Sequence, residues 1–398
     1  MNKKIRKLLL LGAGVLAMTA VSGCSQKRDP SSLKIGLILL HPAASSTYDK
    51  NFREAFEAAQ AKLGFQAIVQ ENIPEGEACQ VTAEEMAEQG CDIVFADSFG
   101  HEDYMIEAAK NYPGTMFCHA TGVKAASAGV KNFYNAFASI YEGRYLAGVT
   151  AGLKLQELYG DENGALEDAE AKIGYVGAYP YAEVKSGYTS FFLGVRSVVA
   201  NATMEVTFTN EWYHESKERT AAELLLNNGA KLISQHADSY GAPNACEEAG
   251  VPNVSYNGST LDQCPNTFLV SSKINWQPYY EHAIDCLINN KELEKDYVGT
   301  FATGSVQLSE FSKNCAAGTA EKVNAIKAEL EAGTRHVFDT SKFTVGGQAP
   351  SEANVRPNQE FTFTCPEGTK FLEDGYYHES FYRSAPSFDV DIDGITII

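Results

Sequence analysis

Residues 231–241 read KLISQHADSYG and contain the pattern on which the fold prediction rests. Leu232 and Ile233 end a short apolar strand, and side chains that hydrogen-bond or stack follow at once. In open α/β sheets, small ligands bind in the crevice beyond the carboxyl ends of the strands. The same succession, an apolar run and then a polar or aromatic cluster, recurs along the chain. We therefore expect several strand ends to converge on one small molecule.

The rest of the chain alternates between apolar strands and helical patterns. Residues 34–40 (KIGLILL) form a near-continuous apolar run, which is typical of a strand buried on both faces of a parallel sheet. One β–α alternation reaches residue 120 and a second starts at residue 172, so we predict an α/β protein with two doubly wound parallel-sheet lobes. The predicted lobes are residues 34–137 with 259–299, and residues 138–258 with 300–398, the latter including a C-terminal extension from residue 338.

The N-terminus has the features of an export signal. Basic residues precede an apolar stretch, residues 8–20, that is too short to span a bilayer comfortably. The sequence VSGC that ends at Cys24 resembles the lipobox of bacterial lipoproteins, in which the cysteine becomes the lipidated first residue. We expect residues 1–24 to be a signal peptide, residues 25–33 to be a tether, and the protein to be lipid-anchored to the cell membrane, facing outside the cytoplasm. An ordinary cleaved signal or a signal anchor is the alternative.

The composition limits the classes of function. A formal charge of −19 argues against nucleic-acid binding, because phosphates need a basic face. The sequence has no HExxH motif, no GxSxG motif and no His/Cys cluster at ligand spacing, so we expect no catalysis, no metal site and no cofactor. Eight cysteines follow Cys24 without a CxxC pair, and both disulfides and buried thiols remain open for them.

Several short segments together carry a family resemblance. They are SFG at residues 98–100, YP at 112–113, HATG at 119–122, EGRYLAG at 142–148, KIGYV at 172–176, QHADS at 235–239 and NW at 275–276. In this order, behind a lipobox, they resemble the basic membrane protein (BMP) family. These proteins are lipoprotein receptors of ABC importers and are related to purine nucleoside receptors. The likeness covers roughly residues 34–280.

The resemblance implies a type I periplasmic-binding-protein fold with three hinge crossings. It also implies a purine nucleoside or nucleobase as ligand and an ABC permease in the membrane as partner, and we expect a monomer. Nucleoside-binding relatives tend to carry an Asp in the first-strand loop and an Asp-x-Asp near the second hinge. Here these segments read HPAASSTYDKNF and YNGST, so fewer carboxylates are available to bind a ribose. This difference favours a free base or a modified ligand over a nucleoside. A receptor for a sugar, and less favourably a surface enzyme acting on nucleosides, are the alternatives.

A purine site needs aromatic walls and a few polar groups that reach the edges of the ring. Trp212 is the strongest candidate for a wall, because its context TNEWYHE is polar. Asp238 can accept hydrogen bonds from the ligand or cap the following helix, and His236 is expected to be structural. Lys273 lies near a position where relatives carry a ribose-contacting Lys. The full set of candidates is Tyr48, Asn51, Ser98, Phe99, Tyr181, Glu183, Trp212, Asp238, Asn257, Lys273 and Trp276.

Overall fold

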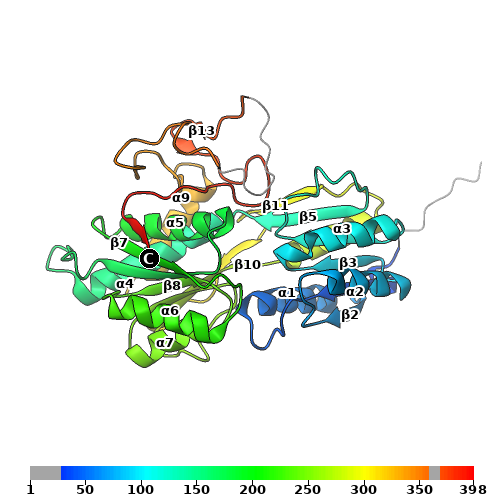
Figure 1. Cartoon of the computed structure of the whole chain (residues 1–398), viewed down its shortest axis with the longest axis horizontal. Coiled ribbons are helices and arrows are strands. Elements are labelled where there is room, and N and C mark those ends of the chain that lie inside the picture. The colour runs from blue at the N-terminus through cyan, green and yellow to red at the C-terminus, as the bar shows by residue number, and fades with distance from the viewer. Residues whose placement is uncertain (1–27, 358–367) are drawn as a thin grey trace, which may run out of the picture.

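The structure is a computed structural model and describes residues 28–357 and 368–398. Two α/β lobes lie side by side, and each has its own β-sheet (Figure 1). The predicted signal peptide, the predicted lipidation site Cys24 and the first three residues of the predicted tether fall outside the described residues, as does Cys365. Within the two described ranges, no helix combines the length and the apolar character that crossing a membrane requires.

The first lobe is built on a parallel sheet with the strand order β11-β5-β4-β3-β1-β2. Its strands are β1 (Lys34–Ile38), β2 (Gln66–Gln70), β3 (Ile93–Ala96), β4 (Met116–Ala120), β5 (Phe133–Ala138) and β11 (Asp296–Gly299). Its helices are α1 (Thr47–Leu63), α2 (Glu77–Glu88), α3 (Glu102–Asn111) and α8 (Gln277–Ile288), with the 3-10 turns η1 (Pro30–Ser32) and η2 (Phe99–His101). Leu37 packs in the core that contains Phe52 of α1, whereas Ile38 packs in a separate core with Met86 of α2. Successive side chains of a strand point to opposite faces, so helices cover both faces of this sheet.

The second lobe contains a sheet with the order β12-β10-β9-β8-β6-β7-β15, in which β12 runs antiparallel to β10. Its strands are β6 (Lys172–Gly177), β7 (Thr203–Phe208), β8 (Ile233–His236), β9 (Asn253–Tyr256), β10 (Phe268–Ile274), β12 (Val306–Leu308) and β15 (Ile395–Ile397). Its helices are α4 (Ile140–Tyr159), α5 (Ala182–Arg196), α6 (Glu215–Asn227), α7 (Gly241–Ala249) and α9 (Thr319–Glu331). The C-terminal extension supplies β15 and a separate antiparallel pair, β13 (Leu372–Glu373) with β14 (Tyr376–Tyr377).

One strand lies in a different sheet from the one that we expected. We placed the strand around residues 268–272 in the first lobe, but β10 pairs with β9 and β12 in the second sheet. The apolar sequence of this strand would suit either sheet, so the sequence alone could not assign it. Its pairing with β9 places it in the second sheet. The chain therefore returns to the first lobe only after Ile274, where α8 packs against α1.

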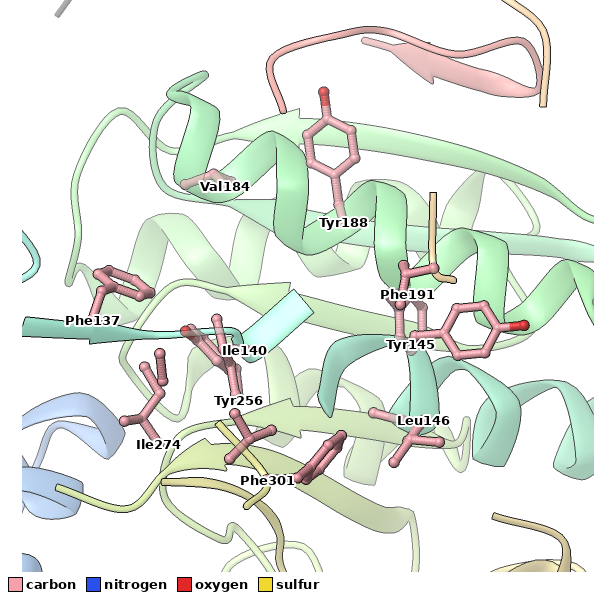
Figure 2. Close-up of a cluster of buried hydrophobic side chains, with 14 of the residues drawn as sticks. Phe137, Ile140, Tyr145, Leu146, Val184, Tyr188, Phe191, Tyr256, Ile274 and Phe301 are labelled. Atoms are coloured by element: carbon pink, nitrogen blue, oxygen red, sulfur yellow. The ribbon is translucent and has the colours of Figure 1, made fainter. Parts of the chain in front are cut away.

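The chain passes between the two sheets after β5, after β10 and after β11. Apolar side chains at these passages are buried, and Figure 2 shows Phe137, Ile140, Ile274 and Phe301 among them. The passages are the three crossings that the resemblance implied. In two-lobed proteins, connecting segments of this kind are the places where backbone rotations allow the lobes to move.

Helices α4 and α5 approach each other closely through glycines. A Cβ on Gly148 of α4 would lie 2.0 Å from the carbonyl oxygen of Phe191 on α5. A Cβ on Gly194 would lie 3.0 Å from the Cα of Gly148. The two backbones are therefore in contact, and residues larger than glycine at these positions would push the helices apart.

The seven cysteines among the described residues are free thiols, and all but Cys315 are buried. Burial raises the pKa of the Cys79 and Cys246 thiols above their usual value. These cysteines therefore behave as small apolar core residues, which decides between the two possibilities that the sequence left open for them.

Candidate functional site

A cavity lies between the lobes, beyond the carboxyl ends of strands from both sheets. We call it the cleft cavity. Its lining residues come from the first lobe (Leu40, Tyr48, Ser98, Phe99 and Thr121) and from the second lobe (Glu183, Trp212, His236, Asp238 and Tyr256). A second cavity, the side cavity, is lined by Phe99, Thr121, Val123, Tyr181, Ala182, Glu183, Arg383, Ala385 and Pro386. The two cavities share Phe99, Thr121 and Glu183, so they are adjoining parts of one site.

Most of the residues that were predicted from strand ends come together here. Six of them line the cleft cavity: Tyr48, Ser98, Phe99, Glu183, Trp212 and Asp238. Tyr181 lines the side cavity. These residues follow strands whose carboxyl ends face the space between the lobes, which is the arrangement that the pattern in residues 231–241 predicted.

The structure places Trp276 and Asn51 away from these cavities. The Trp276 ring is buried and stacks on Phe52 with 4.4 Å between ring centroids, so it belongs to the core of the first lobe. The Asn51 side-chain amide donates a hydrogen bond to the carbonyl oxygen of Ile274. Asn51 thereby fixes α1 to the crossing after β10, which is a structural role.

Asn257 and Lys273 also lie outside the two cavity linings. Asn257 has a φ of 62°, and its backbone N–H donates to the carbonyl oxygen of Ser272 at 2.8 Å. It therefore makes the left-handed turn that its Asn-Gly sequence favours. Lys273 lies on β10 and pairs in register with Gln307 of β12, at the edge of the second sheet.

Aromatic rings from the two lobes form the walls of the site. Phe99 lies in η2, directly beyond β3, and its ring is 6.1 Å from that of Tyr181 in the second lobe. Tyr181 stacks on Tyr179 with a centroid distance of 4.9 Å and an interplanar angle of 6°. Trp212 meets Tyr179 edge-on at 5.1 Å. The rings of the second lobe thus hold one another in place, with Trp212 at a steep angle to the stacked pair of tyrosines.

The polar side of the cleft cavity consists of Glu183, His236 and Asp238. Nε2 of His236 lies 3.4 Å from Oε1 of Glu183. Burial lowers the pKa of His236, while the carboxylate of Glu183 acts in the opposite direction. Burial raises the pKa of Asp238 well above its usual value, and the nearby charge of Asp49 raises it further. The site therefore holds a carboxyl group that keeps its proton easily, beside a histidine that is held neutral.

The first-strand loop is held by two buried carboxyl groups. Oδ1 of Asp49 accepts a hydrogen bond from the backbone N–H of His41 at 2.7 Å, and Oδ1 of Asp97 accepts one from Leu40 at 3.1 Å. The Tyr48 hydroxyl donates to the carbonyl oxygen of Asp97 at 2.6 Å. The loop does contain an acidic residue, Asp49, but its side chain organises the loop and does not line either cavity.

Several lining residues were not among the predicted set. Thr121 follows β4 with a φ of 83°, which is an unusual conformation for a β-branched residue. Tyr256 ends β9, so the strand-end rule would have found it. His236 ends β8 and lines the cleft cavity, whereas we expected it to have a structural role only. The sequence around Arg383 has no regular period, and nothing in it indicated a contact with the site.

The lobes touch each other beside the cleft cavity. The backbone N–H of Thr47 donates to the carbonyl oxygen of Asp238 at 2.9 Å, and that of Gly258 donates to the carbonyl oxygen of Thr47 at 3.0 Å. The free space within the cleft cavity is about 20 Å³, room for little more than one water molecule. A larger ligand can therefore enter only when the lobes move apart.

Residues 28–357 and 368–398 contain no group of three or more His, Cys, Asp or Glu residues that is placed to hold a metal ion. The cleft cavity is lined by aromatic rings, hydroxyls, carboxyls, one imidazole and one leucine. Such a set is suited to holding a small organic molecule by stacking and hydrogen bonds.

The fold and the site together define a two-lobed binding protein for a small molecule. The model of the Bmp family, described as ABC transporter substrate-binding protein PnrA-like, matches residues 33–331, and the chain belongs to this family. The family and the fold that were predicted from the sequence are confirmed. Proteins of this family act outside the cytoplasm, take a small-molecule ligand and have a membrane permease as partner.

Individual relatives are similar over much of the chain. A purine-binding protein of Brucella abortus (strain 2308) is 29% identical over 284 residues, which are 70% of this chain and 76% of that protein. A protein of Haloferax volcanii that is named for glucose binding in an ABC transporter is 31% identical over 247 residues, 62% of this chain and 59% of that protein. The solved ABC transporter solute-binding protein from Conexibacter woesei DSM 14684 has a TM-score of 0.61 at 18% identity and covers 77% of this chain and 98% of its own, so it shares the fold.

Proposed function

We propose that this chain is a lipid-anchored receptor that binds a purine base or nucleoside between its lobes and delivers it to an ABC permease. The observation that carries the proposal is the pair of aromatic walls, with Phe99 in one lobe and Trp212 in the other, on a single cavity. A planar heteroaromatic ring gains from stacking on either wall, and contact with both lobes favours the closed state over the open one. The purine-binding relative from Brucella abortus supports this ligand class.

The polar lining supports an uncharged ligand that is rich in hydrogen-bond donors. Glu183 and Asp238 offer acceptor oxygens, and the lining of the cleft cavity contains no Lys or Arg among the described residues. Exocyclic amines, ring N–H groups and ribose hydroxyls match such acceptors. A nucleotide phosphate would be repelled by the Glu183 carboxylate, and the guanidinium of Arg383 in the adjoining side cavity already donates to two backbone carbonyl oxygens. The lining therefore favours a base or nucleoside over a nucleotide.

A sugar is the second candidate. Tryptophan and carboxylates also suit a sugar, because the ring covers its apolar face and the carboxylates accept from its hydroxyls. The relative named for glucose binding supports this reading. The two candidate ligands would use different parts of the site. A purine can stack on both aromatic walls, whereas a hexose depends more on hydrogen bonds to the carboxyl groups.

Calorimetric titration of residues 25–398 tests the proposal directly. Adenine, guanine, adenosine, guanosine, glucose and ribose are each titrated, with adenosine monophosphate as a charge control. We expect saturable heat with at least one base or nucleoside, and at least about tenfold weaker binding of the monophosphate, because one like-charge contact easily removes about 1.4 kcal/mol. Heat with a sugar and with none of the purines would overturn the purine proposal. Recovery of an unchanged nucleoside after incubation is the expected result for a receptor without catalytic activity.

The lipid anchor is proposed from the lipobox alone. The change Cys24→Ser removes the thiol that would carry the lipid, and one hydrophobic anchor is what would hold an otherwise water-soluble domain on the membrane. We expect the native chain to partition into detergent and the processed Cys24→Ser chain to remain in the aqueous phase. Equal partition of the two chains would contradict the proposal.

A further inference from the structure

The C-terminal extension begins at residue 338, shortly after the family match ends at residue 331. Figure 1 shows its last part, in red, running from beside β11 of the first lobe across α5 to the edge of the second sheet at β7. We use the name strap for residues 379–393 of this segment. The strap contacts both lobes, although the chain has already crossed between them three times.

Several contacts fix the strap to the second lobe. The hydroxyl of Tyr188, which points from α5 toward the strap in Figure 2, donates to Oδ1 of Asp391 at 2.9 Å. Nζ of Lys185 lies 3.3 Å from Oδ1 of Asp389. The Ser186 hydroxyl donates to Oε1 of the buried Glu379 at 2.8 Å. Beyond the strap, β15 pairs with β7, so this attachment is extensive and is made largely by α5.

The hydrogen-bonded attachment to the first lobe is made through Ser384. The backbone N–H of Ser384 donates to Oδ2 of Asp296 at 2.7 Å, and its hydroxyl donates to Oδ1 of the same carboxylate. The Asn135 side-chain amide donates to the Ser384 hydroxyl at 3.1 Å. Ser384 is fully buried, and Asp296 begins β11. Hydrogen bonds to a carboxylate are stronger than those between neutral groups, so this is a specific link.

Between its two attachments the strap lines the site. Arg383, Ala385 and Pro386 line the side cavity together with Phe99 and Tyr181. The Arg383 guanidinium donates to the carbonyl oxygens of Ala385 at 3.1 Å and of Pro386 at 2.6 Å. These bonds fold the strap into a compact turn at the position where the ligand site meets the outside of the protein.

We propose that the strap is a fourth connection between the lobes and a third wall of the ligand site. When the lobes separate, the link between Ser384 and Asp296 must break, because the strap is held more extensively by the second lobe. The strap thereby favours the closed state and slows the release of a bound ligand. It also gives the site a wall that the rest of the chain does not supply, so residues 383–386 help to select the ligand.

The double variant Ser384→Ala with Asp296→Ala tests the link. The matched control is Lys185→Met, which removes ion pairs of the same strap to the second lobe while β15 and Tyr188 still hold it there. Small-angle X-ray scattering on ligand-free residues 25–398 should show a larger radius of gyration for the double variant and no change for the control. The loss of two or more hydrogen bonds should raise the open-to-closed ratio about tenfold. An unchanged radius of gyration in the double variant, or the same increase in the control, would contradict the proposal that the strap links the two lobes.

Two further measurements keep the test decisive. In the native protein, hydrogen exchange should show the amides of Ser384 and Thr47 opening together, because both bonds span the lobes. Exchange of Thr47 while Ser384 stays protected would contradict the link. With a bound purine, the dissociation rate measured by stopped flow should be about tenfold higher in the double variant. Of the three measurements, only this one rests on the proposed function. If no purine binds, the proposed function is wrong, whereas the scattering and hydrogen-exchange results still show whether the strap links the two lobes.

Discussion

The backbone N–H of Thr47 donates a hydrogen bond of 2.9 Å to the carbonyl oxygen of Asp238, across 191 positions of the sequence. Thr47 begins α1 of the first lobe, and Asp238 follows β8 of the second lobe. Because two backbone groups make this bond, side-chain substitutions do not remove it directly. It must break each time the lobes separate, and it places the candidate ligand contact Asp238 at the point where they meet.

Trp212 should carry a large share of the binding free energy. Replacement by Ala removes one aromatic wall, and we expect it to weaken the binding of a purine by about 1–3 kcal/mol, the magnitude of stacking on a base. Calorimetric titration measures the loss. An affinity that equals that of the wild type would remove Trp212 from the site.

The second tryptophan provides a matched control. The chain has two tryptophans, and Trp276 stacks on Phe52 in the core of the first lobe. Ligand binding should therefore change the fluorescence of Trp212 and leave that of Trp276 almost unaffected. We expect Trp276→Phe to keep the fluorescence response and Trp212→Phe to lose it. The reverse result would place the ligand elsewhere.

Asp238 should make the stability of the ligand-free protein depend on pH. Its pKa is raised mainly by burial, so the folded protein holds this proton more tightly than the unfolded chain does. The stabilisation is complete below the unfolded pKa of about 4 and is lost as the pH rises toward the folded pKa. Asp238→Asn cannot ionise and should escape this loss. Its Tm should match that of the wild type near pH 4 and exceed it at pH 8, and a constant difference in Tm would refute the prediction.

His119 should have the opposite effect. Its Nε2 donates to the carbonyl oxygen of Ser98 at 2.6 Å, and burial lowers its pKa to about 4. The unfolded chain takes up the proton more readily, so stability from this group is present above the unfolded pKa and is lost as the pH falls toward the folded value. Between pH 7 and pH 5 the wild type should lose about 2 kcal/mol relative to His119→Gln, which does not titrate. Chemical denaturation at both pH values measures the difference, and equal losses in the two proteins would contradict it.

The contact between α4 and α5 should be sensitive to a single methyl group. A Cβ on Gly148 would overlap the carbonyl oxygen of Phe191, so we expect Gly148→Ala to lower the free energy of unfolding by about 1–3 kcal/mol. The control is Gly114→Ala, because no atom lies within 4 Å of the position that this Cβ would take. Thermal unfolding of both variants gives the comparison. Equal stability of the two would show that the helices can shift without cost.

The site residues that the sequence identified share one local signal. Ser98, Glu183 and Asp238 each follow a short apolar strand, and the carboxyl ends of parallel strands face the same side of a sheet. The same signal also selected Asn51 and Trp276, whose side chains contact a crossing and the core. A strand-end position places a side chain near the cleft, but the direction of that side chain depends on the packing around it.

By itself, the sequence determined the α/β alternation, the two lobes and the class of binding protein, because these depend on apolar periods and short motifs that are local along the chain. The tertiary structure alone decided that β10 belongs to the second sheet, that Thr121 takes a strained conformation and that Ser384 reaches Asp296. These features depend on contacts between residues that are far apart in the chain. Such contacts form only when the sheets pack, and no local pattern of residues encodes them.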